Sequence, residues 1–209
     1  MLITLETVRD EWSACPEYTA DRLAALYPVP RTPIEILTLT DGPWAEVPAA
    51  YRLWTVFHEG VLSDRILRLS ACDSAERALT REREAGREPH RDSWNAVAVA
   101  KRFALGVATA EEMDVARAAA RAAAHTAFAA FYDRGTYADA NTAADNAAAA
   151  FAAAAFAAAN TAADNAAAAF AATTYAATAY AAAATAYAAF AAERRTQVDR
   201  LLTISEENA

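Results

Sequence analysis

The chain has 209 residues and a formal net charge of −8, from 27 acidic and 19 basic side chains. This excess of acid argues against non-specific binding to nucleic acid, which needs clustered Lys and Arg to displace counterions. The same charge permits a basic partner, and the length suits one domain or a small lobe with a larger body.

The two cysteines and the N-terminus indicate a cytoplasmic protein. Cys15 and Cys72 fit neither the spacing of metal ligands nor a disulfide framework, so we expect reduced thiols. The first residues include Glu6, Arg9 and Asp10, where a signal peptide would need an apolar run. We expect no metal and no cofactor.

Helix-breaking residues are concentrated in residues 1–48, which we expect to form a small, partly irregular N-terminal segment. Short helices are predicted near 4–12 and 17–27. The stretch "IEILTLT" that begins at Ile34 alternates with the period of a strand, but a lone strand would have no partner. A helix or a loop is therefore an equal alternative there.

Residues 49–108 have a helical pattern. In "AAYRLWTVFHEGVL", Leu53, Phe57 and Val61 share one stripe. A second helix begins after the cap Ser63 and ends at Gly86, with an inner face formed by Ile66, Leu69, Ala71, Cys72 and Leu79. A third begins at a cap, Asp92 or Ser93, and ends at Gly106.

The clearest helix start is Thr109, because Glu112 follows three residues later and completes a capping box. This helix is expected to end at Gly135. Beyond it, 33 of the 52 residues from 141 to 192 are alanine, the residue with the highest helix propensity. The tract is therefore predicted to be helical.

The tract contains an exact repeat, "NTAADNAAAAFAA", at 141–153 and 160–172. Thr142 precedes Asp145 by three residues, and Thr161 precedes Asp164 in the same way, which is a helix-start signal. We therefore interpret the repeat as two helix beginnings, each after a tight turn. A single continuous helix remains the alternative.

Three other structures are alternatives for this tract. Large residues five apart, such as Phe151 and Phe156, would suit a pentapeptide β-solenoid, but the surrounding alanines favour helix. The uncharged run 166–192 is long enough to span a bilayer, but its Thr and Tyr residues oppose this. Threonines eleven apart, at 174, 185 and 196, resemble alanine-rich ice-binding helices only weakly.

The predicted fold class is all-α: an Ala-rich helical bundle or stacked helical array with a small irregular N-terminal segment. Its expected parts are an N-terminal segment at 1–48, a helical region at 49–108, an Ala-rich helical region at 109–200 and a tail at 201–209. Small alanine side chains should let neighbouring helices approach closely, while the aromatic residues fill the gaps.

No catalytic site is predicted. His58-Glu59 lacks the second histidine of a zinc-protease helix, and His90 and His125 are isolated. The sequence contains no Gly-rich phosphate loop. A non-enzymatic protein is therefore expected.

The region up to about residue 135 resembles a known family. Arg52-Leu53-Trp54, "LSACDSAERAL", "AKRFALG" and the passage into "ARAAARAAA" are similar to bacterial and phage immunity proteins of the Imm5-like kind. The resemblance implies a helical N-terminal part, an Ala-rich helical C-terminal part and a protein partner, and it supplies no catalytic residues.

The functional hypothesis is a non-enzymatic binder, an immunity-type inhibitor that covers a toxin or effector through an acidic helical surface. Candidate partner-binding residues are Asp133, Asp139, Asp145 and Asp164, for which capping or solvation is the alternative role. A phage counter-defence protein, which inhibits a host enzyme or sequesters a nucleotide signal, is the second hypothesis. No membrane contact is expected.

Overall fold

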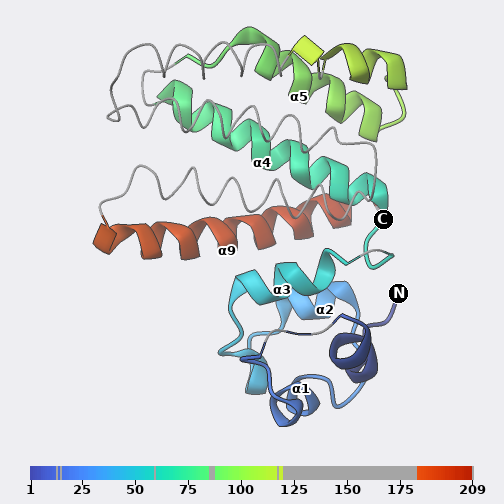
Figure 1. Ribbon diagram of the computed structural model, residues 1–209, viewed down its shortest axis with the longest axis vertical. Helices are drawn as coiled ribbons and strands as arrows, with labels where there is room; N and C mark the ends of the chain where they lie inside the picture. Colours follow the sequence, from blue (N-terminus) through green and yellow to red (C-terminus); the bar gives the residue numbers. More distant parts are fainter. Residues whose placement is uncertain are drawn as a thin grey trace. The chain divides into compact units, whose positions relative to one another are not determined.

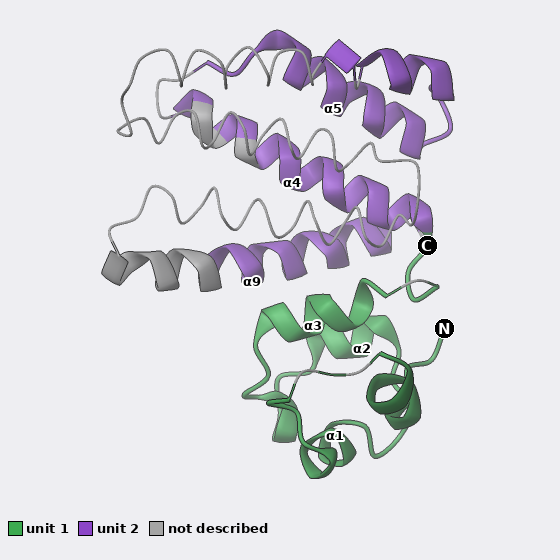
Figure 2. Cartoon of the chain, in the orientation of Figure 1, with its two compact units in different colours: residues 1–63 green, residues 64–209 purple. Residues whose placement is uncertain are grey.

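A computed structural model describes residues 1–12, 14, 16–58, 60–84, 88–116, 118–119 and 183–208. Within these ranges every regular element is a helix, and the β-type pairing is limited to one isolated bridge between Ile3 and Arg31. The predicted all-α class is therefore confirmed. The chain divides into two compact units, Met1–Ser63 (unit 1) and Asp64–Ala209 (unit 2), which Figure 2 shows in different colours.

Unit 1 consists of short helices joined by irregular chain. They are the π-helical turn η1 (Thr7–Glu11), α1 (Ala20–Leu26), α2 (Pro33–Thr38), the 3-10 turn η2 (Gly42–Trp44) and α3 (Ala49–Val56). The helices expected near 4–12 and 17–27 correspond to η1 and α1. The predicted stripe of Leu53, Phe57 and Val61 is buried.

The segment with alternating character, "IEILTLT", is helical. Thr32 accepts a hydrogen bond from the Glu35 amide at 3.2 Å, and the Glu35 carboxylate accepts one from the Thr32 amide at 2.6 Å. Pro33 occupies the first helical turn, where its missing N–H costs nothing. This capping box decides the helix against the strand-like alternation.

The core of unit 1 is built around Trp44, which is 2% exposed. Its indole nitrogen donates to the Leu26 carbonyl oxygen at 3.0 Å, so the end of α1 is tied to η2. The other large side chains that are fully buried here are Ile3, Leu26, Ile36 and Leu53.

Arg52 on α3 is buried, and its hydrogen-bond partners are backbone carbonyl groups. The guanidinium donates to Ile36 O at 2.9 Å, to Trp44 O at 2.7 Å and to Val47 O at 3.2 Å, and it also donates to Leu39 O. Burial lowers the pKa of Arg52 from its ordinary value. One side chain thus satisfies the end of α2 and the loop that leads to α3, in place of backbone donors.

The described part of unit 2 contains three longer helices, α4 (Asp64–Glu84), α5 (Arg91–Ala104) and α9 (Ala183–Glu207). α4 packs against α5 on one side and against α9 on the other, so the three form a helical bundle (Figure 1). A further helical stretch covers 110–116. Residues 201–207, set apart above as a tail, continue α9. None of the described helices is long and apolar enough to cross a membrane.

The ends of α4 and α5 test the sequence-based boundaries. α4 begins directly after Ser63, as expected. α5 ends before Gly106, whose φ of +74° suits the residue that closes a helix. Its predicted cap, Asp92 or Ser93, is wrong: the cap is His90, whose imidazole accepts from the Asp92 amide at 3.3 Å, so the helix begins at Arg91.

One face of α4 forms the apolar core of unit 2. Ala71, Cys72, Ala75 and Leu79 pack with residues of α5 and with Met113 and Ala116 of the stretch 110–116. Most of these side chains are small, so the helices can approach closely, as predicted for an alanine-rich bundle. Burial raises the pKa of Cys72 to about 12, so its thiol stays protonated and inert.

The capping box at Thr109 is confirmed. Glu112 N donates to the Thr109 hydroxyl at 3.2 Å, and Thr109 N donates to the Glu112 carboxylate at 2.8 Å. The hydrogen bonds to Thr109 and Arg102 hold the pKa of Glu112 below its ordinary value.

We expect Thr109→Ala to lower the free energy of unfolding by about 1 kcal/mol, the usual effect of losing an N-cap. Chemical denaturation followed by circular dichroism measures this. Thr203→Ala is the control, because the Thr203 hydroxyl donates to a carbonyl inside α9 and caps no helix. A Thr109→Ala effect no larger than that of the control would contradict the prediction.

Candidate functional site

Unit 1 carries a row of stacked side chains, called here the aromatic row. Its members in order are Arg22, Tyr18, Tyr51, Trp54, His58 and Trp12. They come from α1, from the segment before it, from α3 and its C-terminal end, and from the end of η1. The row therefore links η1, α1 and α3 through contacts between side-chain rings.

The rings of the aromatic row make close contacts. Tyr18 stacks on Tyr51 with centroids 3.7 Å apart, and Tyr51 stacks on Trp54 at 5.3 Å. His58 stacks on Trp12 at 3.9 Å and meets Trp54 edge-on at 4.7 Å. Such offset and edge-to-face pairs are attractive beyond the area that they bury.

The two ends of the aromatic row differ in exposure from its middle. Tyr18 and Tyr51 are buried, whereas Trp12, Trp54 and His58 are half-buried and Arg22 is exposed. Spacing along α3 explains part of this arrangement, because residues three or four apart lie on one side of a helix. Tyr51, Trp54 and His58 follow that spacing, and η1 brings Trp12 to them.

His58 is held in its neutral form. Its Nδ1 lies 3.0 Å from the Trp54 carbonyl oxygen, to which it donates as Nδ1–H. Partial burial between two indole rings lowers the pKa of His58 from its ordinary value, and the hydrogen bond only partly offsets this. Protonation therefore opposes the packed arrangement of Trp12, Trp54 and His58.

We expect the stability of unit 1 to fall as the pH is lowered from 7 to 5.5. The folded state binds the His58 proton less well than the unfolded state, so folding loses free energy once the pH drops through the unfolded pKa of about 6.5. His58→Phe should flatten this dependence, as measured by urea midpoints across the pH range. Equal slopes for the two proteins would contradict it.

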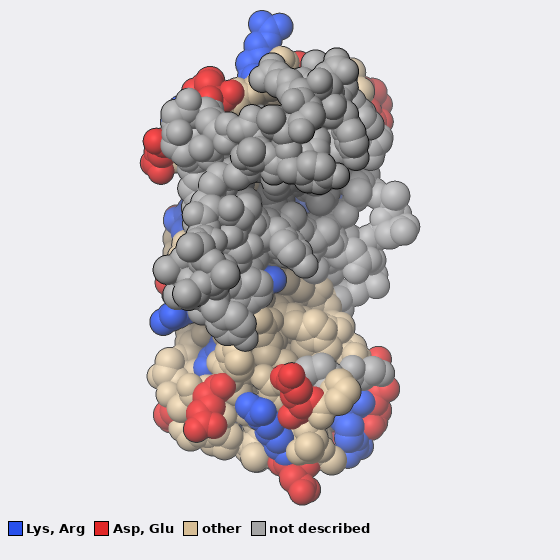
Figure 3. All heavy atoms as spheres, turned by 60° about the vertical axis from the view of Figure 1, so that its left-hand side comes forward, with Lys and Arg blue, Asp and Glu red and all other residues tan. Residues whose placement is uncertain are grey.

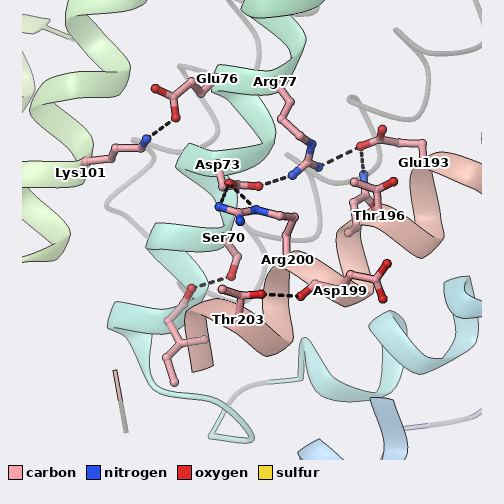
Figure 4. A network of polar contacts seen from close by, with 12 residues as sticks. Ser70, Asp73, Glu76, Arg77, Lys101, Glu193, Thr196, Asp199, Arg200 and Thr203 are labelled. Atoms are coloured by element: carbon pink, nitrogen blue, oxygen red, sulfur yellow. Dashed lines mark hydrogen bonds and ion pairs between the residues drawn. The ribbon is translucent and has the colours of Figure 1, made fainter. Parts of the chain in front are cut away.

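A second group of side chains links α4 and α9, and Figure 4 shows it. This polar network consists of Asp73 and Arg77 on α4 and of Glu193, Gln197 and Arg200 on α9. Arg200 donates through two nitrogens to Asp73, at 2.7 and 3.0 Å. Arg77 donates to Asp73 and, at 2.9 Å, to Glu193.

The inner members of the polar network are almost free of solvent. The Glu193 side chain is 1% exposed, Asp73 is 12% exposed and Arg77 is 20% exposed. Gln197, also fully buried, donates to the Glu193 carboxylate at 3.2 Å. The bonds to Asp73 raise the pKa of Arg200. The charged groups of the network are paired with one another, so we assign the network a structural role.

An ion pair links α4 to α5. Lys101 of α5 donates to the carboxylate of Glu76. α4 is therefore linked by ion pairs to α5 and to α9. The pair to α5 is half-exposed, whereas the network with α9 has a buried inner part and one half-exposed outer member, Arg200. Among the described residues, no group of His, Cys, Asp and Glu side chains is arranged to hold a metal ion.

The four residues predicted to bind a partner lie outside the described residues. Asp133, Asp139, Asp145 and Asp164, and the repeat that contains two of them, stay predictions. Among the described residues, the candidate groups are the aromatic row and the polar network. The sequence signal for the aromatic row is the helical spacing of Tyr51, Trp54 and His58. The polar network joins residues 116 to 127 positions apart, for which the sequence holds no local signal.

The negative charge of the protein is concentrated in unit 1. Residues 1–63 contain nine acidic and four basic side chains, a formal charge of −5 out of −8 for the whole chain. One of the four basic residues, Arg52, is buried. On the face of unit 1 in Figure 3, acidic and basic side chains are interspersed, so the charge is spread over that face.

Comparisons of the chain with models of protein families, with curated proteins and with solved structures found no match.

Proposed function

We propose that this chain is a non-enzymatic binding protein of the immunity type, which inhibits a toxin or effector protein by covering part of its surface. The observation that carries the proposal is the half-exposed end of the aromatic row. Trp12, Trp54 and His58 form a rigid group of rings at the surface of unit 1. Trp, Tyr and Arg are the residues that most often dominate the energy of protein–protein interfaces.

The charge of unit 1 supports a partner of opposite sign. A net charge of −5 over 63 residues attracts a positively charged protein and raises its rate of association. The aromatic end of the row then supplies short-range contact area that charge alone does not provide. The partner in this proposal is a protein with a basic surface around an apolar or aromatic contact.

A growth-rescue assay tests the proposal. Products of genes that neighbour the coding sequence are expressed one at a time in a sensitive host, with and without this chain. We expect one product to be toxic and the chain to restore growth. Rescue without any bound small molecule in the purified complex supports an inhibitor, and a copurified nucleotide would instead favour the counter-defence hypothesis.

Variants then locate the contact. Trp12→Ala and Trp54→Ala should each weaken binding to the toxin that the chain neutralises by about 30-fold or more, the effect expected of an interface hot spot. Ile34→Ala is the matched control, because Ile34 is 50% exposed on unit 1 but lies outside the aromatic row. Thermal unfolding confirms that each variant is folded. If both tryptophan variants bind like the control, the aromatic row is not the contact.

A further inference from the structure

The apolar anchors of α9 have a regular spacing. Val198, Leu201 and Ile204 are buried in unit 2, and Leu201 is completely inaccessible. Each follows the previous one after three residues, so they form one of the diagonal ridges by which helices pack. A ridge of similar side chains at equal spacing fits the neighbouring helix about equally well after its own helix slips by one spacing, which here is three residues.

A slip of three residues exchanges like for like at most apolar positions of α9. Leu201 would take the place of Val198, and Ile204 would take the place of Leu201. Within 183–192 the same slip brings alanine onto alanine at four positions and Phe190 onto Tyr187. A charge enters a buried apolar place only once in each direction: Glu207 at Ile204, or Arg195 at Val198.

The polar network responds differently to the same slip. In one direction Thr196 takes the place of Glu193 and Thr203 takes the place of Arg200, so the two charges on α4 lose their partners on α9. In the other direction the places go to Phe190 and Gln197. Either slip leaves Asp73 and Arg77 only their pair with each other and separates Glu193 from Arg77, which is unfavourable for a buried carboxylate.

We propose that the polar network between α4 and α9 is the main determinant of the register of α9, because its alanine-rich and evenly spaced apolar residues oppose a slip at only one place in each direction. Glu193, Gln197 and Arg200, at spacings of four and three, meet Arg77 and Asp73 in one alignment. Buried polar groups are known to select one alignment of packed helices in this way. The network thereby determines which residues of α9 face the solvent.

A variant that moves the polar residues by one step tests the proposal. The substitutions are Glu193→Thr, Thr196→Glu, Arg200→Gln and Thr203→Arg, with Glu207→Ile to keep the buried place of Ile204 apolar after the slip. The first four recreate the order of carboxylate, amide and guanidinium at the same spacing, three residues later. We expect α9 to slip until these groups meet Asp73 and Arg77, a movement of about 4.5 Å along its axis.

Spin labels at Glu84→Cys and Glu206→Cys measure the movement. Both positions are exposed. α4 and α9 run antiparallel, because Asp73 pairs with Arg200 and Arg77 with Glu193, so the labels lie toward opposite ends and the vector between them follows the helix axes. The background carries Cys15→Ser, and the buried Cys72 thiol stays unlabelled because its pKa is about 12.

In the variant with shifted polar residues, the distance between the labels should shorten by about 4.5 Å and stay a single population. A distance equal to that of the parent protein, in a folded variant, would overturn the proposal. Such a result would mean that other contacts of α9 set its register.

A variant without the network gives a second test if the first does not fold. Asp73→Leu, Arg77→Leu, Glu193→Leu and Arg200→Met together remove the charges and keep the interface filled, and Glu207→Ile again removes the charge that would enter the place of Ile204. We expect two or more distances, because the remaining contacts no longer distinguish the registers. A single parental distance overturns the proposal. Failure of both variants to fold also overturns the proposal. The network would then be required for α9 to pack in the bundle, which is a different role from selecting its position.

Discussion

Arg52→Met is expected to lower the free energy of unfolding of unit 1 by about 4 kcal/mol. The substitution keeps much of the side-chain volume but leaves the carbonyl groups of Ile36, Leu39, Trp44 and Val47 without their donor. Buried polar groups that lose a charged partner cost about 3 to 5 kcal/mol in total. A unit of 63 residues has only about 3 to 9 kcal/mol of stability, so much of unit 1 should unfold.

Urea unfolding followed by tryptophan fluorescence measures this effect, because three of the four tryptophans lie in unit 1. Arg52→Lys should also destabilise, by about 2 kcal/mol, since one ammonium group cannot reproduce the planar fork of a guanidinium. Arg22→Met is the control: its guanidinium is exposed and lies 4.5 Å from the Tyr18 ring centroid, an interaction of about 0.5 to 1 kcal/mol. A loss below 1 kcal/mol for Arg52→Met would show that the four carbonyl groups find other donors.

The second large effect is expected from Arg77→Leu, which should destabilise unit 2 by about 3 to 5 kcal/mol. Arg77 supplies the positive charge that faces the buried carboxylate of Glu193, with 2.9 Å between Nη2 and Oε1. Without it, Glu193 retains Gln197 as a neutral donor in a place that water hardly reaches. Thermal or chemical unfolding followed by circular dichroism reports the loss.

A double-mutant cycle separates this interaction from simple packing. Adding Glu193→Leu to Arg77→Leu removes the stranded charge and should restore about 2 kcal/mol or more. Asp64→Asn is the control on the same helix, because it breaks an exposed pair with Arg68 that is worth about 0.5 kcal/mol or less. If the double variant is less stable than Arg77→Leu alone, Glu193 does not depend on the positive charge.

The sequence predicted the helices of both units where local rules act. Thr109 with Glu112, Ser63 at the start of α4 and Gly106 beyond α5 are short-range signals, and the structure has helix ends at all three places. The cap of α5 was misplaced because histidine is a rare N-cap, so Asp92 and Ser93 were the stronger candidates on propensity. The stretch from Ile34 was ambiguous because its alternation and its capping box predict different structures.

The candidate site was less predictable because it depends on contacts between distant residues. Trp12 meets His58 across most of unit 1, and Asp73 meets Arg200 across most of the chain. Charged residues on a helix are usually solvated, so the sequence offered no reason to single out Glu193 or Arg77. Only the packing of α9 on α4 reveals that these two side chains are buried together.

The contacts of Arg52 also bear on how the sequence can diverge. The guanidinium recognises carbonyl oxygens, and every amino acid carries one, so the identity of the residues at 36, 39, 44 and 47 does not matter to this interaction. Related chains can therefore change the exposed residues of the loop before α3 freely, provided that the buried Trp44 and Val47 and the path of the chain are kept. The arginine itself cannot be exchanged, and an invariant arginine above a variable loop is the pattern by which distant relatives of unit 1 should be recognisable.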